Sequence, residues 1–245
     1  KIFMKKVLFY SVVTIFFAFI FLNAENTFSQ KLVSKHSYTI SKGNIEFAIT
    51  TNSLHQSDGM LIFEVFSTTS GIFKLKKDIR KETSIFKILD NQIISEEYKF
   101  SREKKDKYES YSTKISRDSS KNSRTLVEKN NKKETIDHPY IKNVQDRLSV
   151  QLDYKNRLKA GQYAQVYTVL DKGRVRKYIF SVEALDTINT IFGETKCVVV
   201  KRIIKDNKRS TLTWYAIEQD FIPVIIKQYR NENLQFTARL DKISN

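Results

Sequence analysis

The side chains that could perform chemistry are few and lie far apart in this sequence. The three histidines, His36, His55 and His138, occupy separate segments, and the only cysteine, Cys197, opens an apolar run. A zinc site usually shows short ligand spacing such as HExxH or CxxC, and neither pattern is present. We therefore expect no metal ion, and we expect Cys197 to be a small buried hydrophobic residue without a base to activate it.

Two carboxylates, Asp146 and Asp153, stand in a segment with helical spacing. On a helix they would lie about two turns apart on nearly one face, which is too far for a tightly coupled acid–base pair. The chain contains no GxSxG, Walker-type or GxGxxG motif, and its six glycines leave little backbone for a phosphate-binding loop. We expect no cofactor, and a hydrolase that uses these two carboxylates is the catalytic alternative to a binding role.

The elements that must position these residues are mostly strands. From residue 38 onward, apolar and polar residues alternate in short segments, a pattern typical of half-buried β-strands. The first half predicts strands at 38–49, 59–67, 71–75, 84–89, 93–102 and 108–115. The second half predicts strands at 163–170, 175–184, 187–192, 196–204, 211–218, 222–229 and 234–243. We predict a mainly β fold, an antiparallel rolled sheet or open barrel-like meander with one helix packed on it.

The helix is expected over residues 141–159. Val144, Leu148, Leu152 and Leu158 recur there at helical spacing, and Gly161 is placed to end the helix. The region 99–135 is rich in lysine and serine and interrupts the apolar pattern. It predicts long solvated strands or a mobile loop, with an anion-binding patch as the functional alternative.

One face of the C-terminal strands carries large apolar side chains, among them Trp214 and Phe236. A rolled sheet can be filled by its own side chains, or it can retain a cavity for an apolar ligand. If a cavity exists, we expect Trp214, Tyr215 and Phe236 to line it. The structural alternative for Trp214, the sole tryptophan, is a side chain that packs in the core.

The first 24 residues have the pattern of a secretory signal peptide. Lys1, Lys5 and Lys6 precede an uncharged run over 7–22, and a small-residue cleavage site follows at Ala24. Met4 is the expected initiator. Residues 25–245 are then a single exported β-rich domain, and an uncleaved anchor in the inner membrane is the alternative.

The basic character belongs to the exported part. The chain has 43 Lys and Arg residues against 27 Asp and Glu residues, a formal charge of +16, and loses only three lysines with residues 1–24. An exported chain rarely meets genomic DNA, so we expect no nucleic acid as a partner. The candidate partners are an anionic membrane surface, a lipid or an envelope protein. An AT-rich genome would also enrich lysine without any ligand.

Several short motifs occur in this order along the chain: Asp146-Arg147-Leu148-Ser149, the threonine-rich strand that leads into Gly193, and Trp214-Tyr215-Ala216 followed by Pro223-Val224. In these motifs the sequence resembles the domain-of-unknown-function family 3108 of exported bacterial proteins. The resemblance implies an all-β rolled sheet and a location in the envelope, in the periplasm of a Gram-negative bacterium. The family also looks distantly similar to periplasmic carriers that hold acyl chains in an open barrel.

These observations together predict a non-catalytic binding or scaffolding module of the cell envelope. Such a module would hold an apolar or lipid-like group on a concave β surface. A purely structural role in envelope assembly fits the same residues, so the sequence leaves that alternative open.

Overall fold

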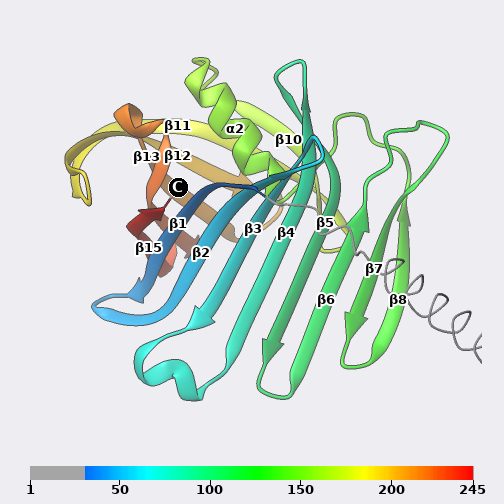
Figure 1. The fold of residues 1–245 in the computed structure, drawn as a ribbon, viewed down its shortest axis with the longest axis horizontal. Coiled ribbons are helices and arrows are strands. Elements are labelled where there is room, and N and C mark those ends of the chain that lie inside the picture. Colours follow the sequence, from blue (N-terminus) through cyan, green and yellow to red (C-terminus); the bar gives the residue numbers. More distant parts are fainter. Residues whose placement is uncertain (1–30, 245) are drawn as a thin grey trace, which may run out of the picture. The chain divides into compact units, whose positions relative to one another are not determined.

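The alternating pattern drives most of the chain into strands, and 15 of them join one continuous sheet. The computed structural model describes residues 31–244 (Figure 1). The expected signal peptide over 1–24 and the expected start at Met4 lie outside these described residues. Within 31–244, no helix has the length and apolar character needed to cross a membrane.

The N-terminal half of the sheet is a meander of eight strands. They are β1 (Lys31–Lys42), β2 (Ile45–Ser57), β3 (Met60–Thr69), β4 (Asp78–Leu89), β5 (Gln92–Lys104), β6 (Lys107–Lys114), β7 (Ser123–Lys129) and β8 (Lys132–His138). A short 3-10 helix, η1 (Gly71–Leu75), connects β3 to β4. Each strand pairs antiparallel with the next one along the chain.

The C-terminal half begins with a short strand and the α-helix. Its elements are β9 (Gln145–Asp146), α2 (Ser149–Lys159), β10 (Gln165–Asp171), β11 (Arg174–Thr190), β12 (Gly193–Ile204), β13 (Arg209–Ala216), the 3-10 helix η2 (Ile217–Gln219), β14 (Ile222–Arg230) and β15 (Asn233–Ser244). Strands β10 to β15 pair antiparallel in sequence order, and β9 adds in parallel to β10.

The two halves join through the first and last strands of the described unit. Strand β1 pairs antiparallel with β15, with Tyr38 opposite Leu240 and Ile40 opposite Ala238. Strands β8 and β9 are the two edges of the sheet, so the sheet stays open and does not close into a barrel. The predicted mainly β fold, an antiparallel rolled sheet with one α-helix packed on it, is confirmed.

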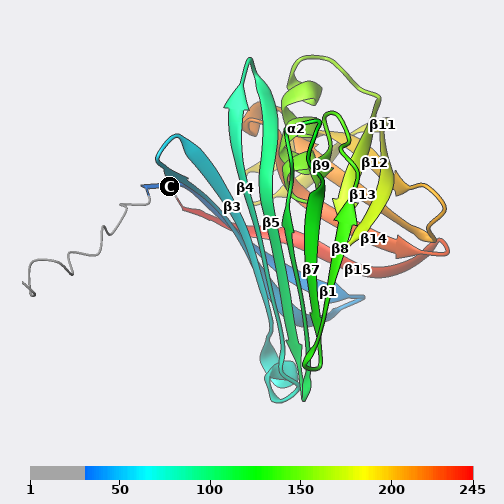
Figure 2. The same cartoon turned by 90° about the vertical axis from the view of Figure 1, so that its right-hand side faces the viewer.

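The sheet rolls so that its halves face each other, with α2 between them at one end (Figures 1 and 2). The β10–β11 turn reaches the inner face of β7 and β8. A Cβ atom added to Gly173 in this turn would lie 2.9 Å from Cδ1 of Ile136. The halves therefore touch along one side of the roll.

One of the two large apolar clusters lies between α2 and the inner face of the C-terminal half, and the other, which includes Tyr38, Cys197 and Trp214, involves no residue of α2. Val150, Tyr154 and Leu158 of α2 pack against a buried cluster made by Tyr167, Val169, Tyr178, Phe180, Val198, Val200 and Tyr215. The Tyr154 and Phe180 rings stack with centroids 4.4 Å apart. Burial of these rings stabilises the contact between α2 and the sheet.

Four expected elements differ in the structure. The expected strand 38–49 is two strands, because a turn at Gly43, with a φ of +59°, separates β1 from β2. The helix expected over 141–159 begins at Ser149, because residues 145–146 pair with β10 and the Asp146 carboxylate accepts hydrogen bonds at the start of the helix. The expected strand 71–75 is the 3-10 helix η1, whose entry residue Gly71 has a φ of +55°. The expected strand 187–192 is the end of β11, which continues through a bulge near Val182.

The basic region 99–135 forms strands in the structure. It runs from the end of β5 into β8, and its inward side chains are buried, among them Tyr111, Thr113 and Thr125. The lysines of this region occupy the outward positions and the turns. The sequence predicted either long solvated strands or a mobile loop here, and the structure shows strands.

Candidate ligand cavity on the concave face

A cavity of about 350 Å³ lies on the concave face, where β1–β4 face β14, β15 and the start of α2. Its lining mixes apolar and charged side chains. The apolar ones are Tyr38, Ile40, Phe47, Ala48, Phe63, Val65, Leu148, Ile226, Phe236 and Ala238; the charged ones are Asp78, Arg80, Glu82 and Arg147. This volume is at the lower end of the range found for ligand pockets, which is about 300–1,000 Å³.

A hydrogen bond between two strands fixes the position of Tyr38 in the apolar wall. The Tyr38 hydroxyl donates a hydrogen bond to the carbonyl oxygen of Pro223 (3.0 Å), which ties β1 to β14. Burial, together with the nearby Tyr215, raises the pKa of Tyr38 well above its usual value, so this hydroxyl stays protonated. Asn52 also lines the cavity, and its buried Oδ1 has no hydrogen-bond partner within residues 31–244.

Asp78, one of the charged lining residues, forms an ion pair with Arg102. Asp78 receives Nε of Arg102 at 2.9 Å and Nη2 at 2.6 Å, a bidentate geometry, and Arg80 lies 3.3 Å from the same carboxylate. Burial alone would raise the pKa of Asp78, but the hydrogen bonds and charges of Arg102 and Arg80 outweigh burial and lower this pKa to about 2.

Arg147 stands between the two halves of the sheet. Its guanidinium group lies 3.3 Å from Glu82 on β4 and 3.9 Å from Asp171 on β10. Tyr98 donates a hydrogen bond to the same Glu82 carboxylate (2.8 Å). Burial alone would lower the pKa of Arg147, but the charges of Glu82 and Asp171 outweigh it and raise this pKa. Arg147 is therefore a fixed cation in the lining.

A smaller cavity of about 130 Å³ adjoins the first and shares Arg147, Gln151, Ile226 and Gln228 with it. Arg202 lines only this smaller cavity. Its Nη2 donates to Oγ1 of Thr211 (2.8 Å), and its guanidinium lies 5.3 Å from the centre of the Tyr178 ring. Its Nε has no hydrogen-bond partner, and within residues 31–244 no carboxylate lies within 4.0 Å of this side chain.

The three residues expected to line a ligand cavity have different positions. Phe236 lines the larger cavity, and Tyr215 lines the smaller one. Trp214 alternates with Tyr215 on β13 and faces the opposite side of the sheet. There its Nε1 donates to Asp186 (2.8 Å), and the Lys227 ammonium lies 4.8 Å from the ring centre. Trp214 is not among the residues that line either cavity.

Asp146 is completely buried and connects both halves of the sheet. Its Oδ2 accepts hydrogen bonds from Ser84 on β4 (2.6 Å) and Ser95 on β5 (2.5 Å). Its Oδ1 accepts from the backbone N–H groups of Leu148 (2.7 Å) and Ser149 (3.0 Å) at the start of α2. This carboxylate has therefore used the four acceptor positions that a carboxylate offers.

Asp153 is also engaged. Its carboxylate accepts hydrogen bonds from Nε of Arg157 (2.7 Å) and from the Tyr167 hydroxyl (2.8 Å). Burial and the negative charge of Asp153 raise the pKa of Tyr167, which keeps its proton. Neither Asp146 nor Asp153 is among the residues that line the two cavities.

The remaining motif residues lie around the cavities or in a turn. Leu148 lines the larger cavity, and Pro223 lines the smaller one. Ser149 donates to Oε1 of Gln145 (2.7 Å) and accepts from the backbone N–H of Asp146 (3.1 Å). Gly193 begins β12 with a φ of +83°, which suits the turn after β11.

The remaining reactive side chains lie apart from one another, and His55 lies 3.8 Å from Glu64. Cys197 is buried, and burial together with Asp186 raises the pKa of its thiol to about 11. His138 shares a hydrogen bond with Oγ1 of Thr125 (3.1 Å), and burial lowers the pKa of this histidine. In the described part of the chain, no three His, Cys, Asp or Glu side chains gather as a metal site would require.

The sequence interpretation missed the charged lining of the cavities. A signal existed, because Asp78, Arg80 and Glu82 alternate along one strand and so share one face. Likewise, Arg202 continues the face that Val198 and Val200 begin. A charge in register with buried valines is the pattern that would have pointed to these positions.

Comparison with known families decides the relationship. The sequence matches the family described as "Protein of unknown function (DUF3108)" over residues 35–239. The chain belongs to the DUF3108 family. The match spans β1 to β15, and so includes every lining residue of both cavities. The expected resemblance is confirmed.

Other comparisons add little to the family assignment. A search of curated proteins found none that matches this DUF3108 member. Among solved structures, a Bacteroides fragilis protein with a YmcC-like fold aligns over 90% of this chain and 97% of its own, with 13% identity and a TM-score of 0.35. A similarity this weak says nothing about function.

Proposed function

We propose that this protein is a non-catalytic binding module that holds an acyl-chain amphiphile on the concave face of its sheet. The observation that carries the proposal is the 350 Å³ cavity, which has an apolar wall from β1, β2, β3 and β15 and a charged lining from β4 and Arg147. Ligand pockets typically combine a mainly apolar lining with a few polar groups that orient the ligand. An apolar chain with a polar head matches both parts of this lining.

The arginines favour an anionic head. Arg147 is neutralised by Glu82 and Asp171, whereas Arg202, in the adjoining cavity, has no carboxylate partner within residues 31–244. An arginine keeps its charge in a protein, and a partly buried guanidinium group without an anionic partner is costly. A carboxylate or phosphate head placed in the smaller cavity would relieve this cost through charge-assisted hydrogen bonds.

Export to the envelope is part of the same proposal. The sequence of residues 1–24 has the composition of a signal peptide, which supports an exported protein. The compartment that we propose is the periplasm of a Gram-negative bacterium, where free acyl chains and phospholipids are available as ligands.

Displacement of a fluorescent fatty acid from the purified full chain tests the binding role. Laurate and dodecanol serve as competitors with the same chain and different heads. We expect both to displace the probe, laurate more strongly by about ten-fold, because a hydrogen bond to a charged group contributes about 1.5–3 kcal/mol. Native mass spectrometry should also show a co-purified amphiphile. No displacement by either competitor would refute the proposal.

Two matched variants locate the ligand. Val65→Trp adds an indole inside the larger cavity and should abolish displacement, whereas Phe66→Trp adds one on the opposite face of β3 and should not. Arg202→Met should reduce the preference for laurate over dodecanol while leaving dodecanol binding unchanged. Equal effects of Val65→Trp and Phe66→Trp would place the ligand elsewhere.

A further inference from the structure

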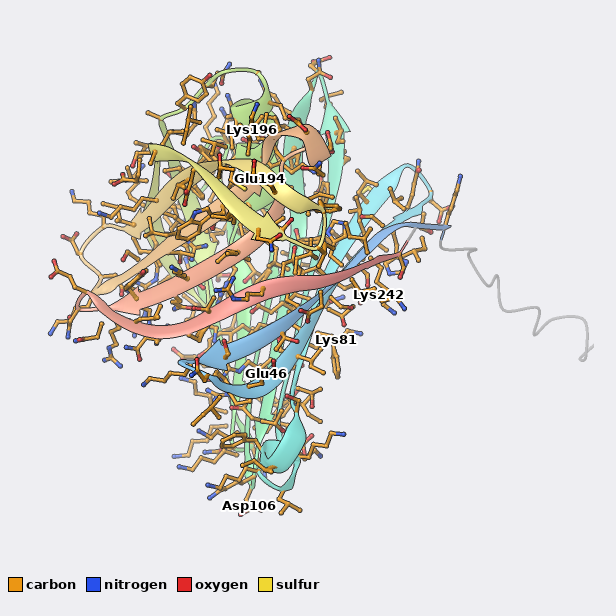
Figure 3. All side chains as sticks on the ribbon, turned by 90° about the vertical axis from the view of Figure 1, so that its left-hand side faces the viewer. Glu46, Lys81, Asp106, Glu194, Lys196 and Lys242 are labelled. Atoms are coloured by element: carbon orange, nitrogen blue, oxygen red, sulfur yellow. The ribbon has the colours of Figure 1, made fainter. Side chains whose placement is uncertain are left out.

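Four turns of the N-terminal half lie at one end of the sheet, and three of them are rich in lysine. Because β3 to β8 form a meander, the β3–β4, β5–β6 and β7–β8 connections all lie at the same end. They comprise residues 70–77, 103–108 and 128–133, and we name this surface the basic tip. Figure 3 shows η1 and Asp106 together at this end, far from Glu194 and Lys196.

Basic residues outnumber acidic residues in the turns of the basic tip, but not in the turns at the opposite end of this half. Its three turns contain nine lysines, Lys74, Lys76, Lys77, Lys104, Lys105, Lys107, Lys129, Lys132 and Lys133, against three acids, Glu103, Asp106 and Glu128. The three turns at the opposite end, residues 57–60, 89–92 and 115–122, contain two basic and three acidic residues. A lysine excess produced by genome composition alone would not favour one end.

Two large apolar side chains project from the same tip. Ile72 is 83% exposed and Leu75 is 95% exposed, and both belong to η1. Their orientation is fixed, because Phe73 between them packs edge-on against Phe47 with ring centroids 6.4 Å apart. Backbone hydrogen bonds from Phe73 N–H to Ser70 and from Lys76 N–H to Phe73 close the turn.

This combination fits a lipid surface better than a protein surface. Protein interfaces are enriched in arginine and aromatic residues and depleted in lysine. The basic tip contains nine lysines and no arginine, and its two most exposed apolar side chains, Ile72 and Leu75, are aliphatic, with Tyr108 less exposed at 42%. At an anionic bilayer, Lys side chains can reach the headgroups while aliphatic side chains enter the acyl boundary. Each lysine near such a surface strengthens binding about five-fold.

We propose that the basic tip is a docking surface for an anionic phospholipid bilayer, with Ile72 and Leu75 inserted and the surrounding lysines on the headgroups. The tip residues are not among those that line the cavity, so this role stands whatever the cavity binds. The lysines Lys74, Lys76 and Lys107 are exposed, and none of them forms an ion pair within residues 31–244.

Vesicle co-sedimentation of the full chain tests the docking surface. The probes are vesicles of phosphatidylglycerol mixed with phosphatidylcholine, and vesicles of phosphatidylcholine alone. We expect binding to the anionic vesicles that weakens with salt, since the Debye length shortens from about 30 Å at 0.01 M to about 10 Å at 0.1 M. Equal binding to both vesicle types would overturn the proposal.

Two triple variants that remove the same number of positive charges distinguish an effect of the basic tip from an effect of the net charge of the protein. Lys74→Gln/Lys76→Gln/Lys107→Gln should weaken binding to anionic vesicles about one hundred-fold, at about five-fold per lysine. The control Lys196→Gln/Lys205→Gln/Lys208→Gln removes three exposed lysines from the C-terminal half and should weaken binding much less. Equal losses in the two triple variants would show that only net charge matters, which contradicts a defined docking surface.

Apolar-matched variants test insertion. Ile72→Ser/Leu75→Ser should weaken binding at least ten-fold, because burying aliphatic carbons drives insertion. Ile88→Ser/Leu89→Ser removes two exposed side chains, 51% and 57% exposed, at the opposite end and should have little effect. If the tip variants bind vesicles as well as the unmodified chain does, the tip does not dock on lipid, and an acidic protein becomes the candidate partner.

Discussion

At the scale of single residues, the carboxylate of Asp146 stabilises the fold. Asp146 accepts four hydrogen bonds, two from side chains of β4 and β5 and two from backbone groups at the start of α2. It therefore joins the N-terminal half to the segment that pairs with β10. A carboxylate with every acceptor site occupied and no place in a cavity lining has no free lone pair for proton transfer.

Asp78 gives the stability of the protein a predictable dependence on pH. Its pKa of about 2 lies below the unfolded value of about 3.9. The carboxylate therefore stabilises the fold above about pH 4, and this contribution is lost as the pH falls toward 2. We expect Asp78→Asn to lower the free energy of unfolding by about 1–2 kcal/mol at neutral pH, since solvent screens part of the ion pair.

Urea unfolding followed by Trp214 fluorescence at several pH values measures this effect. The difference between Asp78→Asn and the unmodified protein should shrink between about pH 4 and pH 2. Asp58→Asn, in an exposed turn, is the control and should leave the free energy of unfolding nearly unchanged. A difference for Asp78 that stays constant down to low pH would contradict the assignment of its ion pair.

At the scale of elements, the β10–β11 hairpin fastens one half of the sheet to the other. Gly173 in its turn has a φ of +73°, and a Cβ atom there would meet Ile136 on β8. Gly59, in the β2–β3 turn, has nearly the same φ of +72° but nothing within 4 Å. An alanine would therefore meet the same backbone strain at both positions, and only at Gly173 would it also meet a side chain of the other half.

We expect Gly173→Ala to lower the free energy of unfolding by about 3 kcal/mol and Gly59→Ala by about 1 kcal/mol. Both variants lose the free energy that a side chain costs in a left-handed backbone conformation. Gly173→Ala loses more because its Cβ atom also clashes with Cδ1 of Ile136. Adding Ile136→Val, which removes that atom, should recover part of the loss in a double-mutant cycle measured by urea unfolding. Equal losses at the two glycines would mean that the hairpin does not press against β8.

At the scale of the whole molecule, the last strand of the described unit lies in the middle of the sheet. Strand β15 pairs with β1 on one side and β14 on the other, so it holds the two halves together. Strand β8, by contrast, is an edge. A proline in a central strand always removes a hydrogen bond from the ladder, whereas an edge strand has N–H groups that face solvent.

Proline scanning distinguishes these positions. Ala238→Pro in β15 should cost about 3 kcal/mol or more and reduce the soluble yield, because the break falls between the halves. Thr135→Pro in β8 should cost about 1 kcal/mol or less. The two-residue turn at Asn130–Asn131 places Thr135 at a non-hydrogen-bonded pair with Leu126, so its N–H faces away from β7. Soluble yield and urea midpoints measure both; a larger loss for Thr135→Pro would contradict the strand order.

The sequence by itself determined the class of fold, because strand periodicity is local: side chains such as Thr213 and Tyr215 share a face whatever they pack against. It also determined the family, since the motifs around Asp146 and Trp214 are contiguous in the chain. Helix start and turn type were less accessible, because a carboxylate acceptor at Asp146 and a turn at Gly71 depend on partners from other strands.

Only the tertiary structure decided which face of each strand lines the cavity. The alternation on β13 leaves Trp214 and Tyr215 as equal candidates, and the rolling of the sheet turns Tyr215 inward. The charged lining arises in the same way, because Glu82 and Arg147 come from elements far apart in the chain. The basic tip is a product of strand order, since antiparallel pairing brings three lysine-rich turns to one end. Local patterns set the elements, and long-range pairing sets which of their side chains meet.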